Sequence, residues 1–415
     1  MNVAGLALRN LARNRRRTAL SIAVVASGTA AIVLTAGFVR FSFDGLSEAM
    51  IHGGLGHLEV AAADEVARRG AGTLDRPASG GLEGWRALRD ELERLPGVVA
   101  TGANLHVMGL AQKPGGVSVS FVGVGVEPDR ERRMEFPTKL RAGAPLPESA
   151  PAPGDDPVLL ARGLAESLDA GVGDTITLLA ADPEGMLNAL DVRVAGIVTT
   201  GVAELDTRWL KLPLASAQRL AQTDRVSNLL VGLDDTARTE AAAAAARALL
   251  AGREPALAVT PWRERAPFYE QVRNLYLGIF RFLGAIVVVL VVLAASNTLV
   301  MTVFERMREL GVLRAIGTTP GQIAALVAGE ALWLGALGAA AGAALGAAGV
   351  AALNAARLTM PPPPGAVDPI DLRLAYVPEA FAGAALLMLV VLGVSAVFPI
   401  VRATRIRVVD ALGHV

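Results

Sequence analysis

The sequence contains no cysteine and very little lysine, with only Lys113, Lys139 and Lys211. Without cysteine, neither disulfides nor thiolate metal sites can form, and redox chemistry does not indicate a compartment. The 39 basic residues, nearly all arginine, are balanced by 39 acidic residues, which gives no formal net charge. Because a nucleic-acid-binding chain usually carries a basic stripe, nucleic acid is not predicted as a partner.

The common catalytic motifs are also missing. No G-x-x-x-x-G-K-[ST] phosphate loop occurs, so this chain is not predicted to bind or hydrolyse ATP. Neither H-E-x-x-H nor G-x-S-x-G is present. His57 and His106 have no carboxylate cluster near them in the sequence, so no metal site is predicted. We therefore expect a non-enzymatic chain without catalytic residues or a cofactor of its own.

Long apolar runs are abundant. The chain is 53% hydrophobic with a mean hydropathy of +0.46, which favours a protein that is part membrane and part soluble domain. Residues 18–39 contain no charge and would extend about 33 Å as a helix, enough to cross about 30 Å of hydrocarbon. A cleaved signal peptide is the alternative, but its apolar core is shorter, about 7 to 15 residues.

Three further runs predict membrane helices. A stalk and second span cover 268–303, the third span covers 323–353, and the fourth covers 379–401. Within the second span, Asn297 is predicted to make an interhelical hydrogen bond. In the third span every fourth residue of one stretch is glycine, which lets another helix approach that face closely. These predicted packing glycines are Gly338, Gly342 and Gly346.

Arginine distribution predicts the topology. Segment 1–17 carries five arginines, and segments 304–322 and 402–415 carry three each. The proline-rich loop 354–378 has two. The positive-inside rule therefore places both termini and segment 304–322 in the cytoplasm, with the loop outside.

Residues 40–267 lack a run long enough to span, and they predict a large α+β extracytoplasmic domain, inserted between the first and second membrane helices. Two lobes are expected, with the proline-rich stretch 146–157 as their linker. Predicted strands are His57–Ala61, Val117–Val126, Thr175–Leu179, Val192–Val198 and Val226–Leu233. Predicted helices are Glu83–Leu95, Leu160–Leu168, Leu214–Ala221 and Thr236–Ala251, the last capped by Asp234 or Asp235.

The charged segment 304–322 carries the strongest family signal. Its sequence ERMRELG (305–311), followed by LRAIG (313–317), resembles the cytoplasmic loop of MacB/FtsX-type ABC transporter permeases, and the chain is closest to their lipoprotein-releasing, Lol-type branch. Collinear similarities follow the same order along the chain. They are at residues 10–18, 56–60, 124–128, 171–174, 196–201 with Glu204 and Asp206, 399–403 and 409–412.

This resemblance implies that 304–322 is a coupling helix that docks on a separate ATPase subunit. The family works as a permease dimer, homo or hetero, with two ATPase copies that hold ATP and Mg²⁺, in the bacterial inner membrane with the large domain in the periplasm. A solvated loop joining two helices is the alternative for this segment. The implied coupling residues are Glu305, Arg306, Arg308, Glu309, Leu310, Gly311, Arg314 and Gly317. Glu330, at the start of the third span, either couples motion or pairs with an arginine of this segment.

The resemblance also implies an amphipathic cargo, most simply a lipoprotein, that enters between the first two spans of paired subunits. The alternative for these apolar residues is that they face lipid or pack in a core. The implied cavity residues are Phe38, Phe41, Phe43, Leu277, Phe280 and Leu283. Two other functions stay open: a MacB-like exporter of peptides or small molecules with a periplasmic adaptor, and an FtsX-like transmitter that regulates cell-wall hydrolases.

Overall fold

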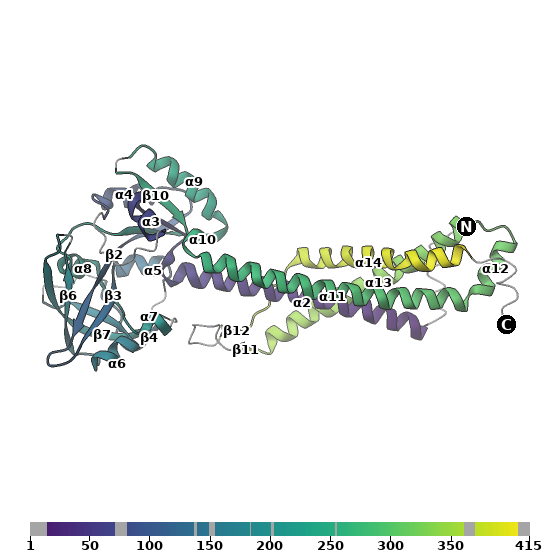
Figure 1. Cartoon of the computed structure of the whole chain (residues 1–415), viewed down its shortest axis with the longest axis horizontal. Helices are drawn as coiled ribbons and strands as arrows, with labels where there is room; N and C mark the ends of the chain where they lie inside the picture. The colour runs from purple at the N-terminus through teal and green to yellow at the C-terminus, as the bar shows by residue number, and fades with distance from the viewer. Residues whose placement is uncertain are drawn as a thin grey trace. The chain divides into compact units, whose positions relative to one another are not determined.

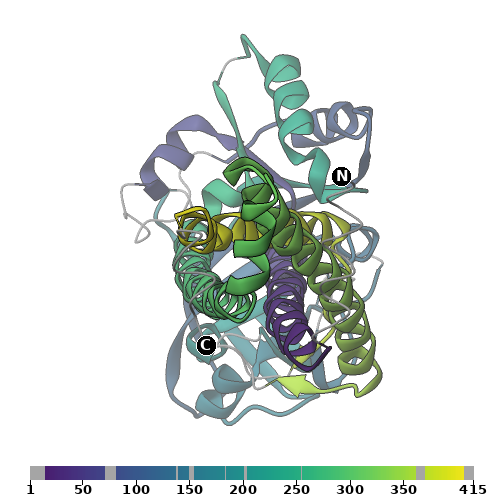
Figure 2. The same cartoon turned by 90° about the vertical axis from the view of Figure 1, so that its right-hand side faces the viewer.

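The computed structural model describes residues 15–70, 81–136, 139–148, 154–182, 184–200, 203–253, 255–360 and 370–405. They divide into two compact units (Figures 1 and 2). A helical unit takes 15–44, 271–360 and 371–405, and a sheet unit takes 45–270 together with residue 370. Most of the predicted basic segment 1–17, the proline run 361–364 and the tail beyond 405 lie outside the described residues.

Four long helices make up the helical unit: α2 (Arg15–Met50), α11 (Pro267–Glu305), α13 (Pro320–Ala355) and α14 (Pro378–Thr404). Each is long and apolar enough to cross a membrane. Helix α2 runs past the predicted span 18–39, because polar and aromatic residues continue it to Met50, whereas α11 agrees with the predicted stalk and span 268–303 to within two residues. The short helix α12 (Met307–Ala315) separates α11 from α13, and a two-stranded ribbon, β11 (Thr359–Met360) and β12 (Ile370–Asp371), precedes α14.

Small residues let α13 lie directly against α2. A methyl group added at Gly338 would come within 2.6 Å of the Val25 side chain, and one at Gly346 within 3.0 Å of Val33. At Gly342 it would meet the Thr29 side chain at 2.4 Å and the Ala26 carbonyl oxygen at 2.5 Å. The three glycines that recur every fourth residue therefore form one face, and that face is covered by α2.

The sheet unit contains a mixed sheet in which β2 (Val98–Gln112) is shared by two halves. Residues 98–104 of β2 pair with β9, and residues 105–112 pair with β3. The strands follow the order β10-β1-β9-β2-β3-β8-β5-β7-β4, and β6 pairs with both β2 and β7. Their bounds are β1 Leu58–Ala62, β3 Ser118–Val126, β4 Lys139–Gly143, β5 Pro157–Ala161, β6 Thr175–Ala181, β7 Leu187–Thr199, β8 Trp209–Pro213, β9 Asn228–Leu233 and β10 Leu257–Pro261.

Short helices connect and cover these strands. Asp235 accepts a hydrogen bond from the Ala237 N–H and so caps the 3₁₀ turn η2, which leads into α9. The prediction of a lobe linker at 146–157 is wrong, because β4 and β5 on either side of it both pair with β7. The helices are α3 Ala63–Gly70, α4 Trp85–Leu92, α5 Pro128–Arg133, α6 Arg162–Leu168, α7 Ala203–Asp206, α8 Leu214–Leu220, η2 Thr236–Arg238, α9 Thr239–Leu250 and α10 Trp262–Arg265.

Candidate coupling site

The turn between α11 and α13 is closed by well-defined helix ends. The backbone φ of Gly317 is +101°, a left-handed conformation that ends α12 and that residues with a side chain rarely adopt. Thr319 then caps α13, since its side-chain oxygen accepts from the Gln322 N–H while the Gln322 side chain accepts from the Thr319 N–H. Pro320 occupies the first helical position, where no backbone donor is needed. The segment is therefore a formed helical elbow.

The inner side of this elbow is packed against the membrane helices. Leu310 is buried in a cluster with Val303 of α11, Ile323 and Val327 of α13, and Ala403 of α14. Gly311, beside Leu310, is buried as well. Burial of these side chains fixes α12 to three membrane helices at once.

Two arginines also hold the elbow from the inside. The Arg306 guanidinium lies 3.1 Å from a Glu309 carboxylate oxygen and 2.8 Å from one of Glu330. The side chains of Arg306 and Glu330 are only 19% and 6% exposed, so this ion pair is largely removed from water. Arg314 donates to the Thr404 carbonyl at 3.3 Å, which ties α12 to the end of α14. Of the two alternatives for Glu330, the structure therefore shows the pairing with an arginine of this segment, Arg306.

The outer side of the elbow presents an exposed face, which we call the docking face: Glu305, Arg308, Val312, Ala315 and Ile316. Arg308, Val312 and Ile316 are spaced by four residues and so lie on one side of the helix. Val312 is 46% exposed and Ile316 75%. Among the described residues, none makes a hydrogen bond or ion pair with Arg308. Exposed apolar side chains beside an available arginine are typical of a protein interface.

The structure thus divides the predicted coupling residues into two groups. Leu310, Gly311, Arg306 and Arg314 hold the elbow together from within. The exposed residues are Glu305, Arg308, Glu309 and Gly317, of which Glu309 also contacts Arg306. Sequence reasoning missed Val312 and Ile316, although their spacing from Arg308 could have indicated a shared face.

The residues predicted to line a cargo cavity lie on α2 and α11, where several of them make ring contacts. Phe38 and Phe280 meet edge to face with centroids 6.2 Å apart, and Phe43 meets Tyr276 in the same way at 6.4 Å. Phe41 and Leu277 are half-buried, and Leu283 is 49% exposed. The aromatic pairs pack the later part of α2 against the early part of α11.

A joint cluster in the sheet unit fixes the last turn of α2 and the first turn of α11. Arg265 of α10 lies 2.7 Å from the buried Glu59 carboxylate of β1 and donates to the Leu55 carbonyl at 2.8 Å. The cluster also contains four residues that are buried together: Ile51, Trp262, Ala266 and Tyr269. The ring centroids of Trp262 and Tyr269 lie 4.9 Å apart. The same few residues therefore anchor both helices to one strand.

A hydrogen-bonded chain extends this joint cluster to η2. His57 is buried, its Nδ1 accepts the Leu233 N–H at 3.1 Å, and its Nε2 lies 3.0 Å from the Thr236 hydroxyl. Thr236 donates to Glu48, whose other oxygen contacts His52 at 2.9 Å. Since Nδ1 is an acceptor, Nε2 carries the proton of a neutral His57. Burial, and then the neighbouring His52, lower the pKa of His57.

This lowered pKa predicts a loss of stability in acid. The unfolded chain takes up a proton on His57 as the pH falls through about 6.5. The folded protein takes up this proton only at a lower pH, because the pKa of His57 is lowered in the fold. The contribution of His57 to stability is therefore fully present above about pH 6.5 and is lost as the pH falls from there through the folded-state pKa. We expect the melting temperature of the detergent-solubilised chain to fall between pH 7.5 and 5.5. In His57→Asn, whose side-chain oxygen can accept the Leu233 N–H, this fall should be smaller; an equal fall in both proteins would contradict the assignment.

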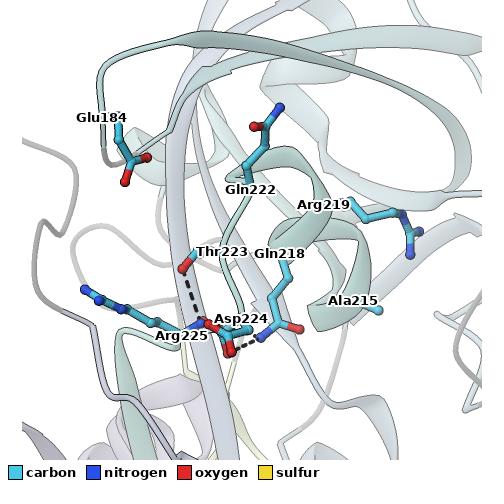
Figure 3. Close-up of a pocket in the computed structure, with 8 residues that line it drawn as sticks. All are labelled: Glu184, Ala215, Gln218, Arg219, Gln222, Thr223, Asp224 and Arg225. Carbon is cyan, nitrogen blue, oxygen red and sulfur yellow. Dashed lines mark hydrogen bonds between the residues drawn. The ribbon is translucent and has the colours of Figure 1, made fainter.

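A polar surface pocket of about 550 Å³ lies beside the end of α8 (Figure 3). The Gln218 side chain donates to the Asp224 carbonyl at 2.8 Å, and the Arg225 N–H donates to the Thr223 hydroxyl. These hydrogen bonds hold the turn that follows α8. Arg219 pairs with the buried Asp156. Within the described residues, no group of three or more metal-ligating side chains occurs. The lining residues are Glu184, Ala215, Gln218, Arg219, Gln222, Thr223, Asp224 and Arg225.

Comparison with known proteins places this architecture in a family. The model of the MacB-like periplasmic core domain matches residues 18–249, and that of the FtsX-like permease C-terminal matches residues 281–408. The transmembrane protein LolC of a lipoprotein-releasing system from Neisseria meningitidis serogroup B is 28% identical over 273 residues. That alignment covers 62% of each chain, so the chain spans less than two thirds of the length of this relative.

Solved structures that resemble part of the chain include two domains of ABC-type transporters. The periplasmic region of MacB from Actinobacillus actinomycetemcomitans has a TM-score of 0.37 and 14% identity, covering 53% of this chain and 95% of that one. The extracellular domain of the ABC-type transporter YknZ from Gram-positive bacteria has a TM-score of 0.34 and 15% identity, covering 49% and 98%. The assignment rests on the family models, which together match most of the sequence. With four candidate membrane helices and a mixed-sheet domain between the first two, the chain belongs to the MacB/FtsX family of ABC transporter permeases.

Proposed function

We propose that this chain is the non-catalytic membrane subunit of an ABC transporter, and that its docking face receives a separate ATPase subunit. The observation that carries the proposal is the combination of exposed Arg308, Val312 and Ile316 with an inner side that is fixed to three membrane helices. A partner that moves this face would move the ends of α11, α13 and α14 together. ATP and Mg²⁺ would be held by two copies of that partner.

The proposed path of the movement is α11, which is one continuous helix from Pro267 to Glu305. Its first turn belongs to the joint cluster, in which Tyr269 packs against Trp262 of α10. The neighbouring Arg265 of α10 pairs with Glu59 of β1. A displacement at the elbow would therefore reach the sheet domain through a helix rather than a flexible linker. This is a shape change carried by a rigid element, and its coupling has to be measured.

For the cargo we propose a lipoprotein, taken up between paired permease subunits in the bacterial inner membrane, with the sheet domain in the periplasm. The similarity to LolC supports this cargo, and the arginine distribution supports the orientation. A MacB-like exporter working with a periplasmic adaptor is the second candidate, because the sheet domain matches the MacB-like model.

The proposal is tested by purifying the tagged full chain from its native membranes with whatever co-purifies. We expect an ATPase subunit in the complex, and an ATPase rate in nanodiscs that rises several-fold with a triacylated lipoprotein. The same protein without its acyl chains is the matched control. Equal rates with both would reject the lipoprotein cargo and favour the exporter, whereas the absence of any ATPase subunit would reject the coupling function itself.

A further inference from the structure

An apolar pocket of about 70 Å³ lies between α2 and α11 in the helical unit, and all four membrane helices contribute to its lining. The side chains from α13 and α14 are buried and close its inner side. On its outer side, Leu20 and Val24 are 69% and 37% exposed, so the pocket opens on the surface that a membrane would cover. The residues that define it are Leu20 and Val24 of α2, Ala294 and Thr298 of α11, Leu334 of α13 and Leu392 of α14.

Water does not suit this pocket, because a buried water needs two to four polar partners. Its two hydroxyl groups are already engaged: Thr298 donates to the Ala294 carbonyl at 2.9 Å, and Ser21 also has a partner within the protein. The neighbouring Asn297 is exposed and does not line the pocket, and its predicted interhelical hydrogen bond stays a prediction. Apolar cavities stay dry and take up apolar molecules, so we expect an apolar occupant.

The pocket lies close to one end of the membrane helices. Leu20 is five residues from the start of α2 at Arg15, and Thr298 is seven residues before the end of α11 at Glu305, each about 8 to 11 Å along its helix. The arginine distribution places these ends at the cytoplasmic side. Phe38, predicted to line the cargo cavity, is eighteen residues beyond Leu20, or about 27 Å along α2. The pocket is therefore within reach of the cytoplasmic leaflet and separate from the predicted cargo cavity.

A cation lies next to the pocket on the same face of α2. Arg16, Leu20 and Val24 are spaced by four residues, which places them in one row along the helix. Arg16 is exposed, and among the described residues it has no hydrogen-bond or ion-pair partner. A guanidinium binds phosphate well, and the side chains that follow it in the row are apolar. A phosphate beside an acyl chain is the chemistry of a phospholipid.

We propose that this pocket binds an acyl chain of one anionic phospholipid of the cytoplasmic leaflet, whose phosphate pairs with Arg16. An anionic headgroup is preferred because, unlike a zwitterionic one, it carries no cation that opposes the guanidinium, and basic residues at this surface attract anionic lipid. The bound chain fills the gap between α2 and the part of α11 that leads into the elbow. This inference goes beyond the proposed function, since it requires neither an ATPase subunit nor a cargo.

Native mass spectrometry of the purified full chain tests the headgroup contact, with phosphatidylglycerol as the anionic probe and phosphatidylcholine as its zwitterionic control. We expect one phosphatidylglycerol per copy of the chain to be retained in detergent that removes phosphatidylcholine. Arg16→Gln should lower this retention about five-fold at equal lipid concentration, the factor expected for one arginine at an anionic surface. Arg281→Gln, which removes another exposed arginine, should leave it unchanged. Equal retention of both lipids, or equal retention by both variants, would overturn the proposal.

A second pair of variants tests the pocket itself. Ala294→Phe places a ring in it and should abolish the retention, whereas Ala285→Phe adds the same ring at an exposed position of α11 and should keep it. Because Ala294→Phe can also fail to fold, the contact is mapped on the wild-type chain with a phosphatidylglycerol that carries a diazirine in its acyl chain. We expect cross-links concentrated at Leu20 and Val24. Cross-links spread equally over exposed residues of α14 such as Leu386, or a second protein in place of lipid at the pocket, would overturn the proposal.

Discussion

Ile316→Asp is expected to abolish the coupling of ATP hydrolysis to this chain while leaving its fold intact. The Ile316 side chain is 75% exposed, so a carboxylate there remains in water in the isolated permease. In a complex that buries the docking face, the carboxylate would lose its water without gaining a partner. If Ile316 is one of the few hot-spot residues of the interface, its loss costs about 2 kcal/mol or more, which corresponds to a loss of affinity of roughly thirty-fold or greater.

The measurement is the recovery of the ATPase subunit with the tagged chain, together with the cargo-stimulated ATPase rate. Leu187→Asp is a matched control, because Leu187 is an equally apolar residue with 79% exposure, located in β7 of the sheet unit. Arg308→Glu should act in the same direction as Ile316→Asp. If Ile316→Asp kept full recovery and full stimulation, the docking face would not be the site where the ATPase binds.

Changes at Arg306 are unsuitable for this purpose. Removing its guanidinium would break the largely buried ion pair with Glu330, and breaking such a pair usually costs about 3–5 kcal/mol. A defect in Arg306→Ala would therefore report on the stability of the elbow as much as on docking. The exposed and inner residues of the same short segment must be tested separately.

Gly342→Leu is expected to prevent stable assembly of the helical unit. A methyl group at this position already falls 2.4 Å from the Thr29 side chain and 2.5 Å from the Ala26 carbonyl oxygen. The carbonyl belongs to the α2 backbone and cannot avoid the clash by changing rotamer. The cost should exceed the ~1–3 kcal/mol typical of overpacked cores, because two helices must move apart.

Fluorescence-detected gel filtration in detergent provides the measurement for Gly342→Leu. Gly393→Leu is the matched control, since a methyl group at Gly393 in α14 meets nothing within 4 Å. We expect a folded peak for Gly393→Leu and aggregated or degraded protein for Gly342→Leu, with Gly342→Ala giving a lowered melting temperature. Equal profiles for the two leucine variants would contradict the close packing of α13 on α2.

The membrane helices were predictable because charge-free length is a strong local signal. The sheet was less so. β3 and β9, rich in valine and leucine, were predicted nearly in place. β2, the longest strand, was missed because its sequence mixes glycine, asparagine and histidine, and because it is specified by pairing with β3 and β9 rather than by propensity. β5 was read partly as a helix, since its apolar run continues into α6.

The candidate site shows the same division. Charged residues at helix-compatible spacing identified the elbow, but which of them face inward depends on the packing of Leu310 against α11, α13 and α14. That packing joins residues up to about a hundred positions apart, so spacing within 304–322 could not separate Arg306 from Arg308. The hydrogen bond between Ser296 and the Ser395 carbonyl of α14 was not predicted, because it depends on the three-dimensional arrangement of the two helices.

The joint cluster has a practical consequence for isolating the sheet domain. A fragment that starts at β1 and stops before α11 would lack Ile51 and Tyr269, and would expose the indole of Trp262. It would also remove the Leu55 carbonyl, which accepts a hydrogen bond from Arg265. A soluble fragment of this domain should therefore retain a turn of each flanking helix, from about residue 45 to residue 270.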